Sequence, residues 1–453
     1  MANALQNLSI DGAIAAARER YVQQRQKSAD AYQAARKVLA GGNTRSVLYF
    51  DPFPLTLQRG EGADVWDIDG HRYCDFVGEF SAGLYGHSEP EIRKAIISAL
   101  DGGIVLAAPT LAEECLASAI RDRFPSLERL RFCNSGTEAN LLAITTAISF
   151  TGRRKIMVFR EAYHGGVLVF SGGGSPMNVP FEFLLADYND TEAAESMIRK
   201  HAHELAAVIV EPILGAGGNI PGSAEFLRTL RRLTQLTGAV LIFDEIKTSR
   251  CGSGGVQKLF NITPDMTTLG KYVGGGLPTG VFGGRADIMG CFDPLGANTL
   301  RHAGTFNNNA CSMAAGLAGL TKVFSADRAD RFLRDEEAFR LELNEIMTSL
   351  NVPIQFVGLG SMFTIHFSSK PITRPKDIEP VSRRLGQLFH LECILANVLV
   401  ASRGDVFMSL AVEPRHKAAL SQAILSFVDA YGDLIRREVA KSAQERDMST
   451  RGA

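Results

Sequence analysis

The 453-residue sequence lacks any apolar run long enough to cross a membrane. Its longest apolar stretches, at 206–210 and 394–401, fall far short of the roughly 18 residues that a spanning helix needs, and they are typical of buried strands. The N-terminus also lacks a basic start followed by an apolar segment, so no export signal is expected. These absences predict a soluble, cytoplasmic protein that has no membrane partner.

An excess of charge of either sign is also lacking. The chain has 48 Lys and Arg residues against 49 Asp and Glu residues, so its formal net charge is −1. A balanced charge argues against nucleic acid as a partner and favours a small-molecule substrate. The seven cysteines form no CxxC pair and no dense framework, which is typical of reduced thiols in the cytoplasm.

The length suits an enzyme built from more than one packed domain. Residues 11–40 have the composition of a helix closed by Gly41 and Gly42. From about 128 to 310, short β-rich runs alternate with helical stretches, which predicts an α/β protein with a mostly parallel sheet covered by helices. The expected parts are an N-terminal helix and part of a small domain at 1–75, a large α/β domain at 76–328, the rest of a small α+β domain at 329–441, and a flexible tail at 442–453.

In a parallel sheet, chemistry concentrates where strands end. The apolar run at 239–243 delivers Asp244 to the end of a core strand, where a carboxylate is costly to bury unless a cation meets it. A protonated pyridine nitrogen is one such cation, and its charge would make the attached ring an electron sink. Magnesium is the rival partner, but the GxxxxGK[ST] loop of a nucleotide site is absent.

Lys271 lies in a glycine-rich setting, TLGKYVGGG, with no acidic neighbour in sequence. Such a setting suits an amine that must lose its proton and attack a carbonyl carbon. The chain between Asp244 and Lys271 has room for one helix and a return strand of the same sheet. Two other lysines compete: Lys247, which is expected to pair with Asp244, and Lys258, which lies in a polar stretch.

Two further junctions offer contacts for a planar, phosphorylated group. Ser135, Gly136 and Thr137 follow a strand and open a helix, whose free N–H groups can bind a phosphate. Ser135 followed by Glu138 is equally the pattern of a plain capping box. Tyr163, after another strand, could stack on a flat ring, although a Tyr-His pair packed in the core explains the same pattern.

Together these motifs resemble the class III aminotransferases of fold type I, in the branch of the glutamate-1-semialdehyde aminomutases, and most of all the β-amino-acid (β-phenylalanine) aminotransferases. The resemblance covers the chain from about residue 40 to residue 440. The motifs that carry it are NSGTEAN (134–140), AYHGG (162–166), VEP (210–212), IFDEI (242–246), TLGKYVGGGLPTGVFGG (268–284) and AGTFNNN (303–309).

The resemblance implies that pyridoxal 5′-phosphate is the cofactor. It implies that Lys271 holds the cofactor covalently and moves a proton, and that Asp244 fixes the pyridinium. Tyr163 and Ile246 would lie on the two faces of the ring. Glu211 looks like the family's carboxylate near the ring oxygen.

The same resemblance implies that Ser135, Gly136 and Thr137 hold the phosphate, together with Thr305 of the partner subunit in a homodimer that shares its active sites. Two departures from the family pattern, EIKTSRCGSGG after Asp244 and AGTFNNNA around Thr305, loosen the assignment of the substrate.

Two arginines are candidates for binding carboxylates, because a guanidinium fork suits that group. They are Arg45, in GGNTRSVLYF, and Arg403, in ASRGDVFMS. The expected reaction moves an amino group by a ping-pong mechanism from a β-amino acid, such as β-phenylalanine, to a 2-oxoacid such as 2-oxoglutarate. The alternatives are a glutamate-1-semialdehyde 2,1-aminomutase, another class III ω-amine aminotransferase, and a non-catalytic protein with this fold.

Overall fold

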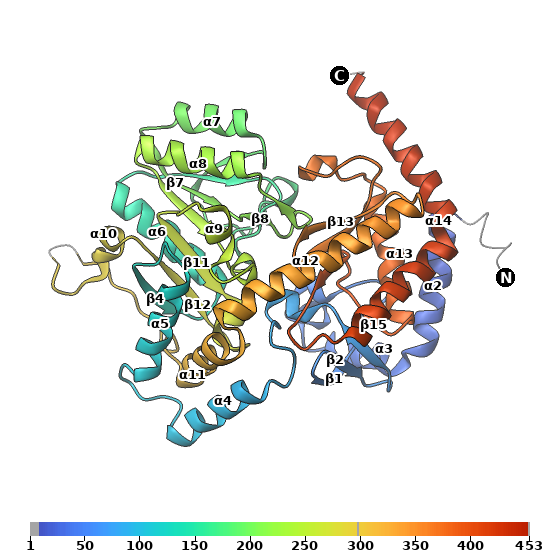
Figure 1. The fold of residues 1–453 in the computed structure, drawn as a ribbon, viewed down its shortest axis with the longest axis horizontal. Coiled ribbons are helices and arrows are strands. Elements are labelled where there is room, and N and C mark those ends of the chain that lie inside the picture. The colour runs from blue at the N-terminus through green and yellow to red at the C-terminus, as the bar shows by residue number, and fades with distance from the viewer. Residues whose placement is uncertain (1–8, 297–298, 452–453) are drawn as a thin grey trace.

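The computed structural model describes residues 9–296 and 299–451. Its larger lobe, on the left of Figure 1, is built around a seven-stranded sheet of order β4-β12-β11-β10-β7-β5-β6. Every neighbouring pair is parallel except the two that β12 makes, so the predicted mostly parallel α/β architecture is confirmed. In chain order the strands are β4 (Arg129–Cys133), β5 (Lys155–Phe159), β6 (Glu182–Ala186), β7 (Leu205–Val210), β10 (Val240–Asp244), β11 (Met266–Gly270) and β12 (Gly280–Gly284).

All residues of β7, β10, β11 and β12 are buried, because the sheet has helices on both of its faces. A two-stranded hairpin of β8 (Ile213–Leu214) and β9 (Ile220–Pro221) lies beyond β7. The helices of this lobe are α4 (Pro90–Gly102), α5 (Leu111–Arg123), α6 (Gly136–Thr151), α7 (Thr191–Lys200), α8 (Ala224–Thr237), α9 (Gly255–Phe260), α10 (Ala286–Met289) and α11 (Ala310–Ala318).

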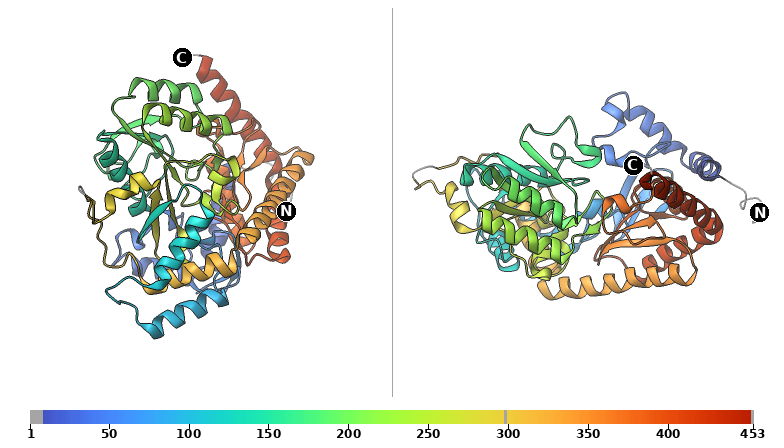
Figure 2. Two further views of the ribbon diagram at one scale, coloured as in Figure 1. Left: turned by 60° about the vertical axis from the view of Figure 1, so that its left-hand side comes forward. Right: turned by 90° about the horizontal axis from the view of Figure 1, so that it is seen from above.

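The smaller lobe combines both ends of the chain, which appear blue and orange to red in Figures 1 and 2. Its first sheet has the order β1-β2-β3-β15, so a strand from near the C-terminus pairs with N-terminal strands, and its second has the order β13-β14-β16. The helix α12 (Ala326–Ser349) runs from the larger lobe into the smaller one (Figure 1). The other elements are α2 (Ile10–Gln24), α3 (Gln26–Ala35), β1 (Leu57–Glu61), β2 (Asp64–Asp67), β3 (Arg72–Asp75), β13 (Ile354–Leu359), β14 (Met362–Phe367), α13 (Ser382–Leu395), β15 (Val398–Leu399), β16 (Asp405–Phe407) and α14 (Pro414–Arg451).

The structure differs from the expected single helix at 11–40, since α2 and α3 are separated at Arg25. The Arg25 guanidinium is buried and donates to the Tyr73 hydroxyl (3.0 Å) and the Ile394 carbonyl (3.1 Å). Asp69, in the turn between β2 and β3, accepts from the backbone N–H of Lys27 (2.8 Å), near the start of α3. The local composition predicts one continuous helix, but these contacts with distant parts of the chain interrupt it at Arg25.

The expected flexible tail from residue 442 is wrong for the described part of that segment, because α14 continues to Arg451. Ser442 is buried, and the Arg446 guanidinium donates to the Asp377 carbonyl at 3.2 Å. We propose that the remaining domain limits, near residues 75 and 328, hold as predicted, since β3 ends at Asp75 and α12 begins at Ala326. Within the described ranges, none of the helices has both the length and the apolar character of a membrane span.

Candidate active site

The carboxyl ends of neighbouring strands border a cavity of about 180 Å³. Because β10 is parallel to both β7 and β11, the residues that end or follow these strands, Glu211, Asp244 and Lys271, come to the same edge of the sheet. The cavity is lined by Gly136, Thr137, Tyr163, His164, Gly165, Glu211, Asp244, Ile246, Lys247 and Lys271. The structure therefore brings together seven of the predicted site residues, from five different motifs.

The Asp244 carboxylate is buried and held by three groups. One oxygen accepts from the Asn140 amide (2.8 Å) and lies 2.8 Å from His164 Nδ1, and the other accepts from the backbone N–H of Ile246 (3.1 Å). The Thr268 hydroxyl donates to the Asn140 carbonyl oxygen at 2.6 Å, which orients that amide. This network fixes the carboxylate where it borders the cavity, so that it can face a cation there.

Lys271 follows β11 directly and adopts a left-handed backbone conformation, with φ of 55°. Burial lowers the pKa of its ammonium group to about 7, with help from the nearby charge of Lys247, while Asp244 and Glu211 oppose the change. Near neutral pH a large share of the Lys271 amines is therefore neutral. A neutral amine is the form that can attack a carbonyl carbon or accept a proton.

Glu211 also lines the cavity and holds the backbone of Tyr163. Its two oxygens accept from the N–H groups of Tyr163 (2.9 Å) and Gly215 (3.0 Å), and burial raises the pKa of its carboxyl group. The Tyr163 ring is about half exposed. Burial raises the pKa of Tyr163, and the positive charges of Arg45 and Arg403 oppose that rise.

At the start of α6, the two interpretations of the Ser135 motif prove compatible. The Ser135 hydroxyl accepts from the Glu138 N–H (3.2 Å) and so caps the helix, while the Glu138 carboxylate accepts from the N–H of Asn134 (2.7 Å), one residue before the N-cap, rather than from Ser135 as in a full capping box. The first N–H groups of the helix, at Gly136 and Thr137, keep no partner within the helix. The helix start is thus both capped and able to bind an anion.

Glycine is required beside this helix start. Gly165 has φ of 131°, and a Cβ built there would lie 2.3 Å from the Thr137 hydroxyl, which itself accepts from the Gly166 N–H (3.2 Å). A Cβ on Gly136 would lie 2.6 Å from the Ile246 side chain. These close approaches bring the helix start, the loop of Tyr163 and the turn after β10 together around one cavity.

Neither of the two candidate arginines lines the cavity itself. Arg45 forms an ion pair with Glu79, and its guanidinium carbon lies 5.3 Å from the centre of the Phe80 ring. Arg403 donates to Asp405 at 3.0 Å. Both arginine side chains are 44% exposed, so each could turn toward a ligand without losing a buried position.

Thr305 lies away from this cavity in the single chain. It is exposed and borders a separate hollow with the loop at 104–110. Its neighbour Asn307 accepts from the Asn134 side chain at 2.8 Å, so the Thr305 loop starts close to the capped end of α6. The assignment of Thr305 to a partner subunit's site stays a prediction.

Of the two competing lysines, Lys258 is exposed and donates to the Ser253 hydroxyl (2.9 Å), outside the cavity. Lys247 lines the cavity, but the expected ion pair with Asp244 is wrong. The Lys247 ammonium group instead donates to the Asn219 side-chain carbonyl at 3.2 Å, because Asp244 is already occupied by its own donors and Lys247 extends in another direction. The sequence interpretation also gave no role to Asn140 or His164, although His164 lies in a quoted motif.

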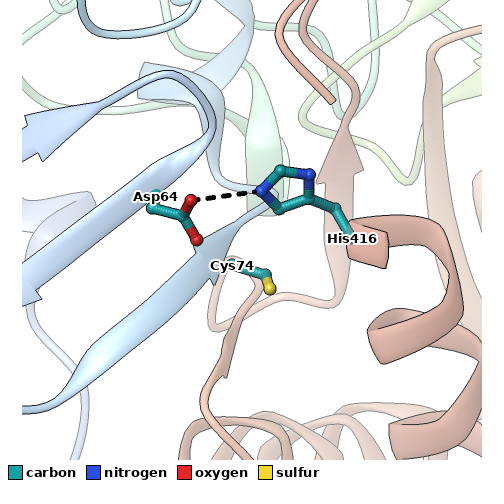
Figure 3. Close-up of side chains that lie close together, drawn as sticks. All are labelled: Asp64, Cys74 and His416. Carbon is teal, nitrogen blue, oxygen red and sulfur yellow. Dashed lines mark hydrogen bonds and ion pairs between the residues drawn. The ribbon is translucent and has the colours of Figure 1, made fainter. Parts of the chain in front are cut away.

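A second cluster, in the smaller lobe, has the side chains of a metal site, as Figure 3 shows: Asp64, Cys74 and His416. The Asp64 carboxylate, however, already accepts from Arg415 (2.7 Å) and Arg72 (2.8 Å), and lies 3.3 Å from His416 Nε2. Two guanidinium groups leave little reason for a metal cation to bind there. The cluster therefore joins the start of β2 to the start of α14.

Asp64→Asn is expected to lower the free energy of unfolding by about 1–3 kcal/mol at neutral pH, because it removes charge-assisted hydrogen bonds from a buried site. Burial alone would raise the pKa of Asp64, but hydrogen bonds from Arg415, Arg72 and His416 outweigh it and hold the pKa well below its usual range. The stabilisation is therefore complete above pH about 4 and is lost as the pH falls further.

Urea unfolding of the parent and of Asp64→Asn at several pH values measures this. The difference between the two proteins should shrink on acidification, whereas Glu61→Gln, at an exposed carboxylate, should change stability by less than about 0.5 kcal/mol. A difference that does not depend on pH would contradict the assignment.

Comparison with known proteins gives a consistent result. The family described as Aminotransferase class-III matches residues 49–392. The beta-phenylalanine transaminase of Variovorax paradoxus is 47% identical over 429 residues, which cover 95% of this chain and 99% of that protein. Its crystal structure covers 94% of this chain and 99% of its own, with a TM-score of 0.92.

Two further relatives are more distant. The crystal structure of an omega-transaminase from Sphaerobacter thermophilus is 34% identical, covers 89% of this chain and 98% of its own, and has a TM-score of 0.84. A glutamate-1-semialdehyde 2,1-aminomutase from Methanococcoides burtonii is 35% identical, over 80% of this chain and 89% of that protein. These similarities extend well beyond the cavity to both lobes.

Proposed function

We propose that this chain, which belongs to the class III aminotransferase family and is a pyridoxal-phosphate-dependent transaminase, moves an amino group from a β-amino acid to a 2-oxoacid. The observation that carries the proposal is the meeting of Lys271 and Asp244 in one cavity. Arg403 is connected to this cavity through Asp405 and Asn219, which contacts Lys247 in the cavity wall. The amino groups and the carboxylates of the substrates would thus both find partners at the same site.

The residues present fit pyridoxal phosphate. Asp244 offers a buried and oriented carboxylate for the pyridine nitrogen, and the start of α6, with Ser135, Gly136 and Thr137, offers N–H groups and hydroxyls for the phosphate. Lys271 offers an amine whose pKa burial lowers to about 7. When bound, the cofactor supplies a ring that withdraws electrons and stabilises negative charge on the substrate carbon.

Each residue has a defined task in this proposal. Lys271 Nζ takes the proton from the substrate carbon that carries the amine and returns it later, and Asp244 keeps positive charge at the pyridine nitrogen. Tyr163 and Ile246, which line the cavity, would cover the two faces of the ring and limit access of water. Glu211 would hold the side of the ring that carries its oxygen.

The phosphate site is completed by Thr305 of the partner subunit, so the active enzyme is a homodimer. Support comes from the position of the Thr305 loop, which is exposed in the single chain and lies next to the capped start of α6 through Asn307. Sedimentation of the purified protein tests this association.

The proposed donor is a β-amino acid such as β-phenylalanine, the acceptor is a 2-oxoacid such as 2-oxoglutarate, and the two react in turn by a ping-pong mechanism. A donor panel against 2-oxoglutarate tests this: β-phenylalanine, β-alanine, α-alanine, a simple aryl amine and glutamate semialdehyde. β-Phenylalanine should react best. Equal rates with the aryl amine, which has no carboxylate, would contradict a carboxylate clamp.

The second candidate function is that of an aminomutase, which the 35% identity to a glutamate-1-semialdehyde 2,1-aminomutase favours. Conversion of the semialdehyde alone, without transfer from any other donor, would decide for it.

Arg45→Ala and Arg403→Ala should each lower kcat/KM for substrates that carry carboxylates by about 10–100-fold, since each removes a charge-assisted contact of roughly 1.5–3 kcal/mol. The visible absorbance of the bound cofactor should be unchanged, because neither residue lines the cavity. Arg59→Ala, at an exposed arginine stacked on Trp66, is the matched control. A parallel loss of cofactor absorbance would show that an arginine supports the cofactor instead.

A further inference from the structure

Lys247 brings a second ammonium group to the cavity that Lys271 lines. Among residues 9–296 and 299–451 it makes one hydrogen bond, to the Asn219 side-chain carbonyl (3.2 Å), and its nitrogen lies 4.8 Å from the centre of the Phe407 ring. An ammonium group has three N–H donors. Two of the three are therefore left for a ligand.

Nearby carboxylates do not neutralise this corner of the cavity. Asp405 is buried and accepts from Thr364 (2.5 Å) and Arg403 (3.0 Å), while the Asn219 amide lies between Asp405 and Lys247. Asp405 thus lies near two cations, Lys247 and Arg403, and contacts Lys247 only through the Asn219 side chain.

Glu211 makes no ion pair with Lys247 among the described residues. Its oxygens already accept from the N–H groups of Tyr163 and Gly215. A Cβ on Gly215 would lie 2.7 Å from Lys247 Nζ and 2.9 Å from a Glu211 oxygen, so only glycine leaves space for both groups. Burial lowers the pKa of Lys247, and the charges of Asp405 and Glu211 oppose this change, as expected of a cation that lacks a close counter-ion.

The position of Lys247 selects the kind of anion that it can meet. Lys247 and Lys271 line one cavity of about 180 Å³. A substrate carboxylate that binds to Lys247 must therefore lie close to the substrate carbon that reacts near Lys271. In a 2-oxoacid the carboxylate is bonded directly to that carbon, whereas in a β-amino acid one more carbon separates them.

We propose that Lys247 is a specificity-determining residue that binds the carboxylate next to the keto group of the 2-oxoacid acceptor, with Arg403 beside it. This rests on the proposed function, which supplies the 2-oxoacid. Arg45 is then left for the carboxylate of the β-amino acid, and the two half-reactions use different cations.

The test compares Lys247→Met, which keeps the length and loses the charge, with Lys247→Arg, which keeps the charge. Lys247→Met should raise KM for 2-oxoglutarate by about 10–100-fold, as expected for the loss of one charged contact. The half-reaction with β-phenylalanine should suffer far less, and Lys247→Arg should restore most of the affinity for the acceptor. Lys258→Met, at the exposed lysine, is the matched control.

Calorimetric binding of glutarate, which has the carboxylates of 2-oxoglutarate but cannot react, gives a measurement independent of turnover. Its dissociation constant should rise about tenfold or more in Lys247→Met. Unchanged glutarate affinity and unchanged KM, or equal losses in both half-reactions, would overturn the assignment. One outcome is that the parent enzyme fails to use β-phenylalanine while Lys247→Met still binds glutarate more weakly than the parent does. In that case the proposed donor is wrong and the carboxylate site at Lys247 is supported.

Discussion

Lys271→Ala abolishes turnover and the covalent attachment of pyridoxal phosphate, while the fold persists. The variant loses the single amine that both follows β11 and lines the cavity beside Asp244. Alanine tolerates the left-handed backbone of this position about as well as lysine does, so no new backbone strain arises. Removal of an amine that is costly to bury in its charged form also relieves a desolvation penalty. The free energy of unfolding should therefore change by less than about 2 kcal/mol.

Borohydride reduction of the parent enzyme followed by peptide mapping identifies the attached lysine directly. The expected label is on Lys271, and Lys271→Ala should still bind the cofactor without a covalent link through the start of α6. Lys258→Ala, at an exposed lysine outside the cavity, should behave like the parent. Normal turnover of Lys271→Ala, or a label on Lys247 or Lys258, would show that the assignment is wrong.

Asp244 and Lys271 could be singled out from sequence because both depend on a local pattern. An apolar run that ends in a carboxylate marks the end of a core strand, and β10 does end at Asp244. Parallel strands bring their carboxyl ends to one edge, so two such ends already indicate a shared site. The start of α6 was equally readable, because a helix N-cap is a local signal.

The partners of these residues could not be read in the same way. Asn140 and His164 contact Asp244 from elements far away in the chain, and nothing in their own neighbourhoods specifies that contact. Lys247 shows that closeness in sequence does not predict a contact either. It is close to Asp244 in sequence, but the turn after β10 directs its side chain to Asn219 and Phe407.

Tertiary contacts also decided the ends of the chain. A composition typical of one helix became α2 and α3, because the buried Arg25 binds Tyr73 and the end of α13. A polar segment that looked like a frayed tail continues α14, where Arg446 reaches Asp377. Local propensity is a weak guide where a few distant contacts stabilise another arrangement.

Asp244→Asn should lower turnover by at least about two orders of magnitude while the cofactor still binds. The carboxylate is expected to raise the pKa of the pyridine nitrogen by a few units, each worth about 1.4 kcal/mol, and an asparagine carries no charge to do so. An uncharged nitrogen makes the ring a poorer electron sink, so Lys271 would have to remove a less acidic proton. The Asp244 carboxylate contacts the Asn140 amide, His164 Nδ1 and the Ile246 N–H. The amide of an asparagine has one acceptor oxygen in place of two, so its NH₂ group would face a partner that now meets an oxygen.

Steady-state kinetics of Asp244→Asn, with the cofactor content measured in parallel, separates the loss of charge from the loss of cofactor. The matched control is Glu245→Gln, at the next residue, since its carboxylate is equally buried but accepts from Val256 and Gln257 rather than facing the cavity. That variant should lose stability and keep kcat per bound cofactor. If Asp244→Asn stays within a factor of about ten of the parent, which corresponds to only about 1.4 kcal/mol, the pyridine nitrogen must have another partner.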